Sequence, residues 1–262
     1  TRWALLEILM PREIRKSPKA MEQVLHQIYA MRNSPSHWHD KYIKGEVTLS
    51  YSLEVASFGG DIHFYVRTPA QFRNIVEAQI YANYRDVEIV DVADYVDRLP
   101  SRTAELYKMG MDLFGVELVL RKDEAYPIRM YIQFEAIEEE KALDPLSALI
   151  EELSRVKKDE QLWIQLAIRP AESSWRERGE KVVKALKEKG VSKARVMGSA
   201  EDLVTISRSP GETEVLKQVE ANLSKPGFDT VIRYLYLAPR SVFNIQLAMR
   251  GVRSAFNQYA AS

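Results

Sequence analysis

The amino-acid sequence predicts an α+β fold made of two modules, each with an antiparallel sheet. One reason is a motif that occurs twice, as YVRTPAQFRNI at residues 65–75 and as LYLAPRSVFNI at residues 235–245. Both copies are β-rich runs that end at proline and continue as P-x-x-h-x-N-I, where h is a hydrophobic residue and x is any residue. Pro69 and Pro239 lie 170 residues apart. The second reason is that segments with a period of two alternate along the chain with segments of helical period.

Composition limits the classes of protein to which the chain can belong. At 262 residues and 46% hydrophobic content, the chain can bury a large core. Lys plus Arg equals Asp plus Glu at 37 each, which argues against a strongly basic nucleic-acid surface but leaves room for a local patch. The absence of cysteine excludes disulfides and thiolate metal sites. No apolar run reaches the roughly 18 residues of a transmembrane helix, so we expect no membrane span in this chain.

The first predicted strand covers residues 3–10 (WALLEILM) and stops at Pro11. A helix then opens at Ser17-Pro18, because the apolar residues that follow recur at helical spacing and form one stripe. The stripe consists of Met21, Val24, Leu25, Ile28 and Tyr29.

Residues 47–55 and 62–67 both alternate apolar and polar side chains, and Gly59-Gly60 between them suits a tight hairpin turn. If Phe58 faces Asp61 across that turn, then Val55 lies opposite Phe64 and the apolar faces match. A helix from Pro69 and a strand at residues 87–92 follow. The order βαββαβ is that of a ferredoxin-like module, with two helices on one face of an antiparallel sheet.

Residues 115–121 and 128–134 read as a further hairpin that extends the first sheet, and a helix capped by Asp144 connects to the next module. The first module, with this extra hairpin and connecting helix, is therefore expected to span residues 1–157.

The second module is expected to span residues 158–262 and starts with a strand at residues 161–169. A charged helix at residues 174–189 follows, and residues 191–208 have no clear pattern. Ser209 and Glu212 form a capping box for the next helix, before the repeated strand at residues 230–238 and the repeated helix. No strand follows that helix, so we expect this ferredoxin-like module to lack its last strand.

The sequence offers no candidate for catalysis or for binding a cofactor. It has no G-x-x-x-x-G-K-[ST] and no G-x-G-x-x-G, the two common phosphate-binding motifs. His37, His39 and Asp40 cluster, but no third histidine lies nearby, and His26 and His63 lack a nucleophile motif. We therefore expect no catalytic, cofactor or metal site, and we rank a small-molecule enzyme last among the functions considered.

An open sheet face is the candidate for nucleic-acid contact, because ferredoxin-like sheets stack bases on exposed aromatic side chains. The residues expected on it are His63, Tyr65, Arg67, Tyr234 and Tyr236. The alternative is that these side chains pack across strands, and Glu54, expected opposite Tyr65, would repel phosphate.

The last helix is the candidate interface. Its apolar positions are Phe243, Leu247, Val252 and Phe256. A module without its last strand leaves a sheet edge and part of an apolar face uncovered, and such edges recruit other chains. We therefore expect a homo-oligomer or docking to another subunit.

Six segments occur in this order along the chain: SPKAMEQVLHQIY, SLEVASFGGDIHFYVRTPAQFRNIVEAQIYANY, VEIVDVADYV, WIQLAIRPAESSWRERGEKVVKAL, SPGETEV and SKPGFDTVIRYLYLAPRSVFN. Together they cover nearly the whole chain and resemble the N-terminal, pre-motor domain of bacterial proteins similar to type IV secretion and conjugative DNA-transfer ATPases. In that family a HerA/FtsK-like P-loop motor lies downstream, and membrane-spanning segments commonly lie upstream.

The resemblance implies an assembly or docking domain of a membrane-associated secretion or DNA-transfer machine, placed in the cytoplasm at the inner face of the membrane. Its partners would be copies of itself, other subunits of the machine, and a P-loop ATPase in cis or in trans. Because the chain has no Walker motif, any ATP hydrolysis belongs to residues outside these 262 or to a partner. The alternative within the same machine is a domain that guides nucleic acid along the open sheet face.

Overall fold

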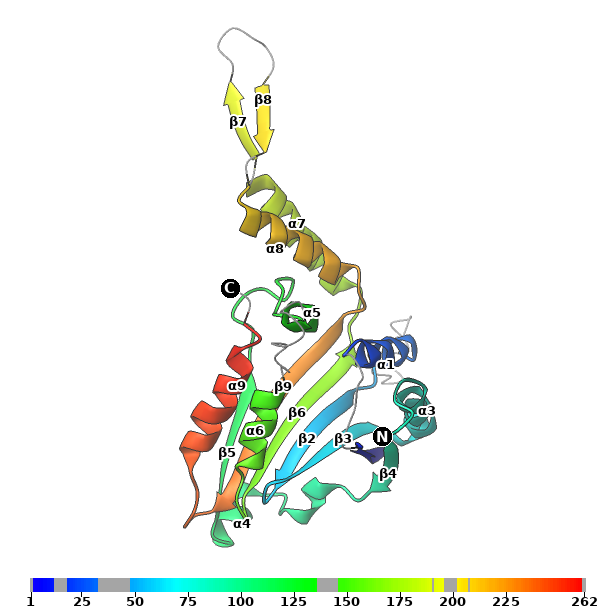
Figure 1. The fold of residues 1–262 in the computed structure, drawn as a ribbon, viewed down its shortest axis with the longest axis vertical. Coiled ribbons are helices and arrows are strands. Elements are labelled where there is room, and N and C mark those ends of the chain that lie inside the picture. Colours follow the sequence, from blue (N-terminus) through cyan, green and yellow to red (C-terminus); the bar gives the residue numbers. More distant parts are fainter. Residues whose placement is uncertain are drawn as a thin grey trace, which may run out of the picture.

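A seven-stranded antiparallel sheet with the strand order β4-β1-β3-β2-β6-β9-β5 forms the body of the protein (Figure 1). The computed structural model describes residues 2–11, 18–32, 48–135, 146–189, 191–195, 202–206 and 208–260. Within these residues the α+β class is confirmed. Strands from both expected modules, residues 1–157 and 158–262, hydrogen-bond into this one sheet.

The first half of the sheet follows the sequence prediction closely. Its strands are β1 (Trp3–Leu9), β2 (Tyr51–Phe58), β3 (Asp61–Pro69) and β4 (Glu88–Val92), and its helices are α1 (Lys19–Ala30) and α3 (Arg73–Asn83). The β2–β3 register is confirmed, with Phe58 opposite Asp61 and Val55 opposite Phe64. Gly59 and Gly60 have φ angles of 64° and 98°, as the predicted tight turn requires.

The start of α3 differs from the prediction of a helix at Pro69. A 3-10 turn, Ala70–Phe72, comes first, and Thr68 makes no cap because its buried hydroxyl bonds the carbonyl oxygen of Pro69 at 3.4 Å.

The second half of the sheet contains β6 (Gln161–Pro170), β9 (Phe228–Pro239) and β5 (Met111–Leu118). The expected uncovered edge of the second module is wrong, because β2 pairs with β6 and β5 pairs with β9. The chain itself supplies both neighbours of this β6–β9 pair: β2 of the first half pairs with β6, and the connecting region supplies β5.

The region after β5 also departs from the prediction. The expected hairpin of residues 115–121 and 128–134 is one strand, β5, followed by a short helix, α5 (Tyr131–Glu135). The Gln133 side chain accepts a hydrogen bond from the Met130 amide at 2.9 Å, which favours the helical turn. Phe134 is buried and packs edge-on against Tyr259. Asp144 lies outside the described residues, and the connecting helix α6 covers Ser147–Ser154.

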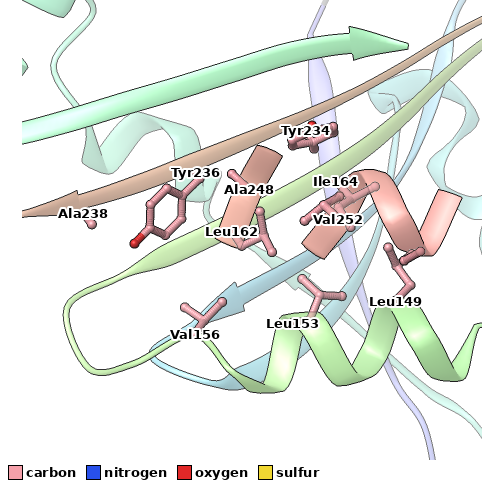
Figure 2. Close-up of a cluster of buried hydrophobic side chains, with 11 residues drawn as sticks. Leu149, Leu153, Val156, Leu162, Ile164, Tyr234, Tyr236, Ala238, Ala248 and Val252 are labelled. Atoms are coloured by element: carbon pink, nitrogen blue, oxygen red, sulfur yellow. The ribbon is translucent and has the colours of Figure 1, made fainter. Parts of the chain in front are cut away.

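Helices α1, α3, α6 and the C-terminal helix cover one face of the sheet. The C-terminal helix has a π-helical part, Leu247–Val252, and an α-helical part, α9 (Arg253–Asn257). Figure 2 shows Leu149 and Leu153 of α6 facing Leu162 and Ile164 of β6. A second buried cluster joins α1 and α3 to the first strands through Val24, Ile28, Val76, Ile80, Leu6 and Val66. Burial of this apolar face is the main stabilising term of the fold.

An arm projects from one end of the sheet (Figure 1). It contains α7 (Ser174–Lys189), β7 (Val191–Arg195), β8 (Asp202–Ile206) and α8 (Pro210–Leu223), so the unassigned region 191–208 includes a two-stranded hairpin. The predicted capping box of Ser209 and Glu212 at the start of α8 is confirmed. Among the described residues, no helix is both long enough and apolar enough to cross a membrane.

Candidate functional site

The second face of the sheet carries a segment that crosses it from β4 to β5. This crossing segment, residues 93–110, contains a 3-10 turn (Tyr95–Arg98) and the short helix α4 (Thr103–Lys108). Tyr95 is only 2% exposed and packs edge-on against Trp163, with ring centroids 4.8 Å apart. Its ring also lies 5.3 Å from that of Tyr65. The crossing segment therefore covers the centre of the face that the sequence left open.

A row of polar residues runs across this face beneath the crossing segment. The strand register places Glu7, Tyr65, Glu54, Gln165, Arg233 and Glu117 next to one another in that order. Glu54 is 3% exposed and lies at the centre of the row. A carboxylate at such a depth is stable only if its oxygen atoms accept hydrogen bonds.

Glu54 has those partners. Its Oε1 accepts a hydrogen bond from Arg67 Nε at 2.9 Å, and its Oε2 accepts one from Gln165 Nε2 at 3.2 Å and another from the Tyr95 hydroxyl. Gln165 also donates to the Tyr95 hydroxyl at 2.9 Å. Its Oε1 accepts from Arg233 Nε at 2.8 Å. The polar network thus joins β3, β2, β6 and β9 to the crossing segment.

Asp94 is the second carboxylate of the network. It receives two hydrogen bonds from the Arg67 guanidinium, one of them from Nη2 at 3.0 Å, and one from the Val96 amide at 3.0 Å. The hydrogen bonds from Arg67 lower the pKa of Asp94, and the bonds to Asp94 raise the pKa of Arg67. Burial, followed by the charge of Glu54, raises the pKa of Tyr95. Asp94 stays ionised, Arg67 charged and Tyr95 neutral near pH 7, which suits a fixed structural network better than proton transfer.

A groove of about 600 Å³ lies beside the crossing segment. Its lining combines apolar side chains, among them Trp3, Val96, Trp163 and Leu235, with Arg67, Asp94, Gln165 and Arg233 of the polar network. Trp3 is 45% exposed at its rim. Among the described lining residues, no buried polar side-chain atom lacks a hydrogen-bond partner.

His63, Tyr65 and Arg67 lie on this face, as the sequence analysis expected. Their rings and polar atoms are already in contact with other side chains of the same protein. His63 Nδ1 lies 2.5 Å from Glu7 Oε1, and its ring stacks on Tyr65 at 6.0 Å between centroids. Tyr65 is 7% exposed, and burial followed by the Glu7 charge raises its pKa to about 12. The geometry agrees with the packing alternative rather than with an open stacking surface.

Tyr234 and Tyr236 require a correction. They point to the opposite face, into the core beneath the helices, where they are 2% and 0% exposed (Figure 2). The repeat itself contains the reason, because its offset aligns Tyr234 with Phe64 and Tyr236 with Val66, both on the helix-covered face. The residues aligned with Tyr65 and Arg67 are Leu235 and Leu237, so β9 does not repeat these two side chains.

The four residues expected at an interface also face inward. Val252 is fully buried (Figure 2). Phe243, Leu247 and Phe256 pack against the same core cluster. Ile245 and Met249, which the sequence analysis did not select, are the exposed apolar side chains of this helix, at 38% and 44%.

The sequence analysis placed Glu54 and Arg67 on this face but missed the polar network that joins them to Asp94, Tyr95, Gln165 and Arg233. A usable signal was present in β2 and β6, where a single Glu and a single Gln interrupt the apolar runs YSLEVA and LWIQLAI. A charged residue inside a strand that is buried on both faces needs a buried partner. Asp94 and Tyr95 lie in a segment without periodicity, so no pattern in the sequence connects them to the sheet.

His37, His39 and Asp40 lie outside the described residues. Within the described ranges, no three His, Asp or Glu side chains are grouped in a way that would hold a metal ion. The model of a family described as a domain of unknown function, DUF8128, matches residues 1–262. No curated protein and no solved structure matches the chain.

Proposed function

The chain belongs to the DUF8128 family over residues 1–262, and we propose that it is a non-catalytic docking domain of a membrane-associated type IV secretion or DNA-transfer machine. It works next to a P-loop ATPase at the inner face of the membrane and contacts its partner with the arm. The place in such a machine rests on the sequence resemblance alone. The docking role rests on the arm.

The shape of the arm is the observation that carries the proposal. It begins and ends at the paired ends of two neighbouring strands, where Pro170 lies opposite Phe228 and the Ala171 amide bonds the Gly227 carbonyl at 2.9 Å. The seven-stranded sheet is therefore complete without the arm, and the arm contributes no strand to it. An element that extends away from a complete core is well suited to contact another protein.

The base of the arm is held to the body by charged side chains. Lys225 Nζ lies 2.6 Å from Glu22 Oε1 of α1, and Arg178 Nη2 lies 2.6 Å from Glu124 Oε1. Farther out, α7 and α8 pack on each other, and Lys187 pairs with Glu220 at 2.7 Å. Two anchor points at the base limit the directions the arm takes, which lowers the entropic cost of docking.

We also propose that the fold arose by duplication of a ferredoxin-like unit. The order β4-β1-β3-β2 of the first four strands supports it, as does the constant offset between the two copies of the strand–proline–helix motif. In the second unit β6 and β9 take the places of β1 and β3, and β2 and β5 flank them.

Excising the arm tests the docking role. Joining Ala171 to Gly227 through an Asn-Gly turn turns β6 and β9 into a hairpin and removes residues 172–226. Coexpression with the P-loop ATPase of a type IV secretion machine, followed by affinity purification, is expected to recover the ATPase with the intact chain and not with the excised chain. Equal recovery with a well-folded excised chain contradicts the proposal.

A further inference from the structure

The two outer strands of the sheet differ in a way that concerns association. Strand β4 has five residues, two of them acidic (Glu88 and Asp91), and Asp91 pairs with Arg73 at 3.3 Å. Short, charged edges of this kind resist pairing with other chains. Strand β5 also has two acidic residues, Asp112 and Glu117, but it is eight residues long and contains neither lysine nor proline. Among the described residues, no strand pairs with the outer side of β5.

The backbone of β5 presents hydrogen-bonding groups on that outer side. The Arg240 amide donates to the Gly110 carbonyl at 2.9 Å, so Gly110 and the even-numbered residues of β5 direct their backbone groups toward β9. Pro239, which has no N–H, lies opposite Met111. The amides and carbonyls of the odd-numbered residues therefore face outward. These residues are Met111, Leu113, Gly115 and Glu117.

Exposed apolar side chains lie next to this edge. Figure 1 shows the C-terminal helix next to α6, on the β5 side of the sheet. Gly251 faces Glu152 of α6, and Ala248 and Val252 point into the core. Helical periodicity then places Ile245 and Met249 on the side turned away from α6, beyond β5. Val119, directly after β5, is 80% exposed.

We propose that β5 pairs antiparallel with β5 of a second copy about a two-fold axis through Gly115, which joins the two sheets into one. In this register Gly115 opposes its own copy, Phe114 opposes Val116, and Met111 opposes Val119. The aromatic–β-branched pair forms twice, and exposed Val119 gains an apolar partner. Both C-terminal helices then lie on the same face of the joined sheet, with Ile245 and Met249 of each copy turned toward the interface.

The charges favour a second copy as the occupant. In this register Asp112 opposes Leu118 and Glu117 opposes Leu113, so no like charges face each other across the ladder. The chain has a formal net charge of zero, so two copies do not repel one another at long range. A closed two-fold pairing also uses the β5 edges of both copies and leaves only the short, charged β4 edges, which limits assembly to a dimer. The arm takes no part, so this inference stands apart from the docking role.

Cysteine crosslinking tests both the dimer and its register, because the chain has no cysteine of its own. Residues that face each other in a hydrogen-bonded antiparallel pair have Cα atoms about 5.5 Å apart, within the range of a disulfide. A Cβ on Gly115 comes no closer than 3.8 Å to its neighbours, so Gly115→Cys fits the folded chain. We expect Gly115→Cys to form a covalent dimer under mild oxidation.

Two matched control variants distinguish a disulfide formed within the paired dimer from one formed by random collision of two chains. Glu117→Cys lies on the same face of the same strand, but its copy is roughly 13 Å away in this register, too far for a disulfide. Gly211→Cys introduces the same thiol on the arm, where nothing lies within 4 Å. Gly115→Cys is expected to crosslink at least about tenfold faster than either control, because pairing raises the effective thiol concentration toward the millimolar range.

Light scattering of the wild-type chain adds a readout without mutation. The expected mass rises with concentration toward twice 30.1 kDa. A mass of one chain at every concentration up to hundreds of micromolar overturns the dimer and leaves the edge to a strand of another protein. Equal crosslinking of Gly115→Cys and Glu117→Cys overturns the register.

Discussion

Arg67 Nη2 donates a hydrogen bond to Asp94 Oδ1 at 3.0 Å, which ties the centre of the sheet to the segment that crosses it. Arg67 Nε binds Glu54 on its other side. The guanidinium thus lies between two carboxylates, and the crossing segment is held down by ionic hydrogen bonds as well as by packing of Tyr95. Charge-assisted bonds of this kind are shorter and stronger than neutral ones.

Removing Glu54 is expected to be strongly destabilising. Glu54→Ala leaves the Tyr95 hydroxyl, Gln165 and one side of Arg67 without their shared acceptor, and breaking a buried ion pair on one side costs roughly 3 kcal/mol or more. Urea unfolding measures the loss. Asp229→Ala, which removes an exposed pair with Arg169, is the control and should cost less than about 1 kcal/mol. Similar losses for both variants would show that the network is not structural.

The contribution of Asp94 is expected to depend on pH. Arg67 lowers the pKa of Asp94 in the folded protein, so the pair stabilises the fold above the unfolded-state pKa of about 3.9 and loses this effect as the pH falls through the lower folded value. Asp94→Asn should therefore be less stable than wild type at pH 7 and closer to it at about pH 3. A stability difference that stays constant across this range would contradict the assignment.

The arm depends on close contact between its helices at Gly179. A Cβ at this position would lie within 3.2 Å of Leu223 Cγ, so Gly179→Ala requires the Leu223 side chain to shift within the contact between α7 and α8. Such overpacking costs roughly 1–3 kcal/mol. Gly211→Ala adds the same methyl group at the start of α8, where nothing lies within 4 Å. Faster amide hydrogen exchange in α7 and α8 is expected for Gly179→Ala only, and equal rates in both variants would argue against tight packing.

The chain alone is expected neither to bind ATP at micromolar concentrations nor to hydrolyse it. The sequence contains no phosphate-binding loop of the P-loop or dinucleotide-binding type. Isothermal titration calorimetry with Mg-ATP measures binding, and release of inorganic phosphate measures hydrolysis. Saturable binding would contradict the assignment of this chain as a domain without a motor.

Most individual elements were predictable from the sequence, because their signals are local. The alternation in β2 and β3, the Gly59-Gly60 turn and the capping box at Ser209 each depend on residues close in sequence, and all three match the structure. The helix of residues 174–189 was also predicted with its correct bounds.

The pairing of the two halves was not predictable in the same way. Strand β2 pairs with a strand at each of its edges, but its sequence does not show whether the second edge meets β6 or solvent. The same limit applies to the candidate site, because Asp94 reaches Arg67 only when the crossing segment lies over the sheet. Contacts between segments far apart in the chain leave no periodic signal.

Photo-crosslinking in cells tests the docking role of the arm most directly. A photoreactive amino acid at Lys184 of α7 or Lys217 of α8 probes the exposed surface of the arm, and the same residue at Glu88 or Glu105 probes the exposed surface of the body. With the P-loop ATPase of the secretion machine coexpressed and tagged, arm positions are expected to give adducts with the ATPase, and body positions are not. Adducts from the body positions alone would contradict docking through the arm.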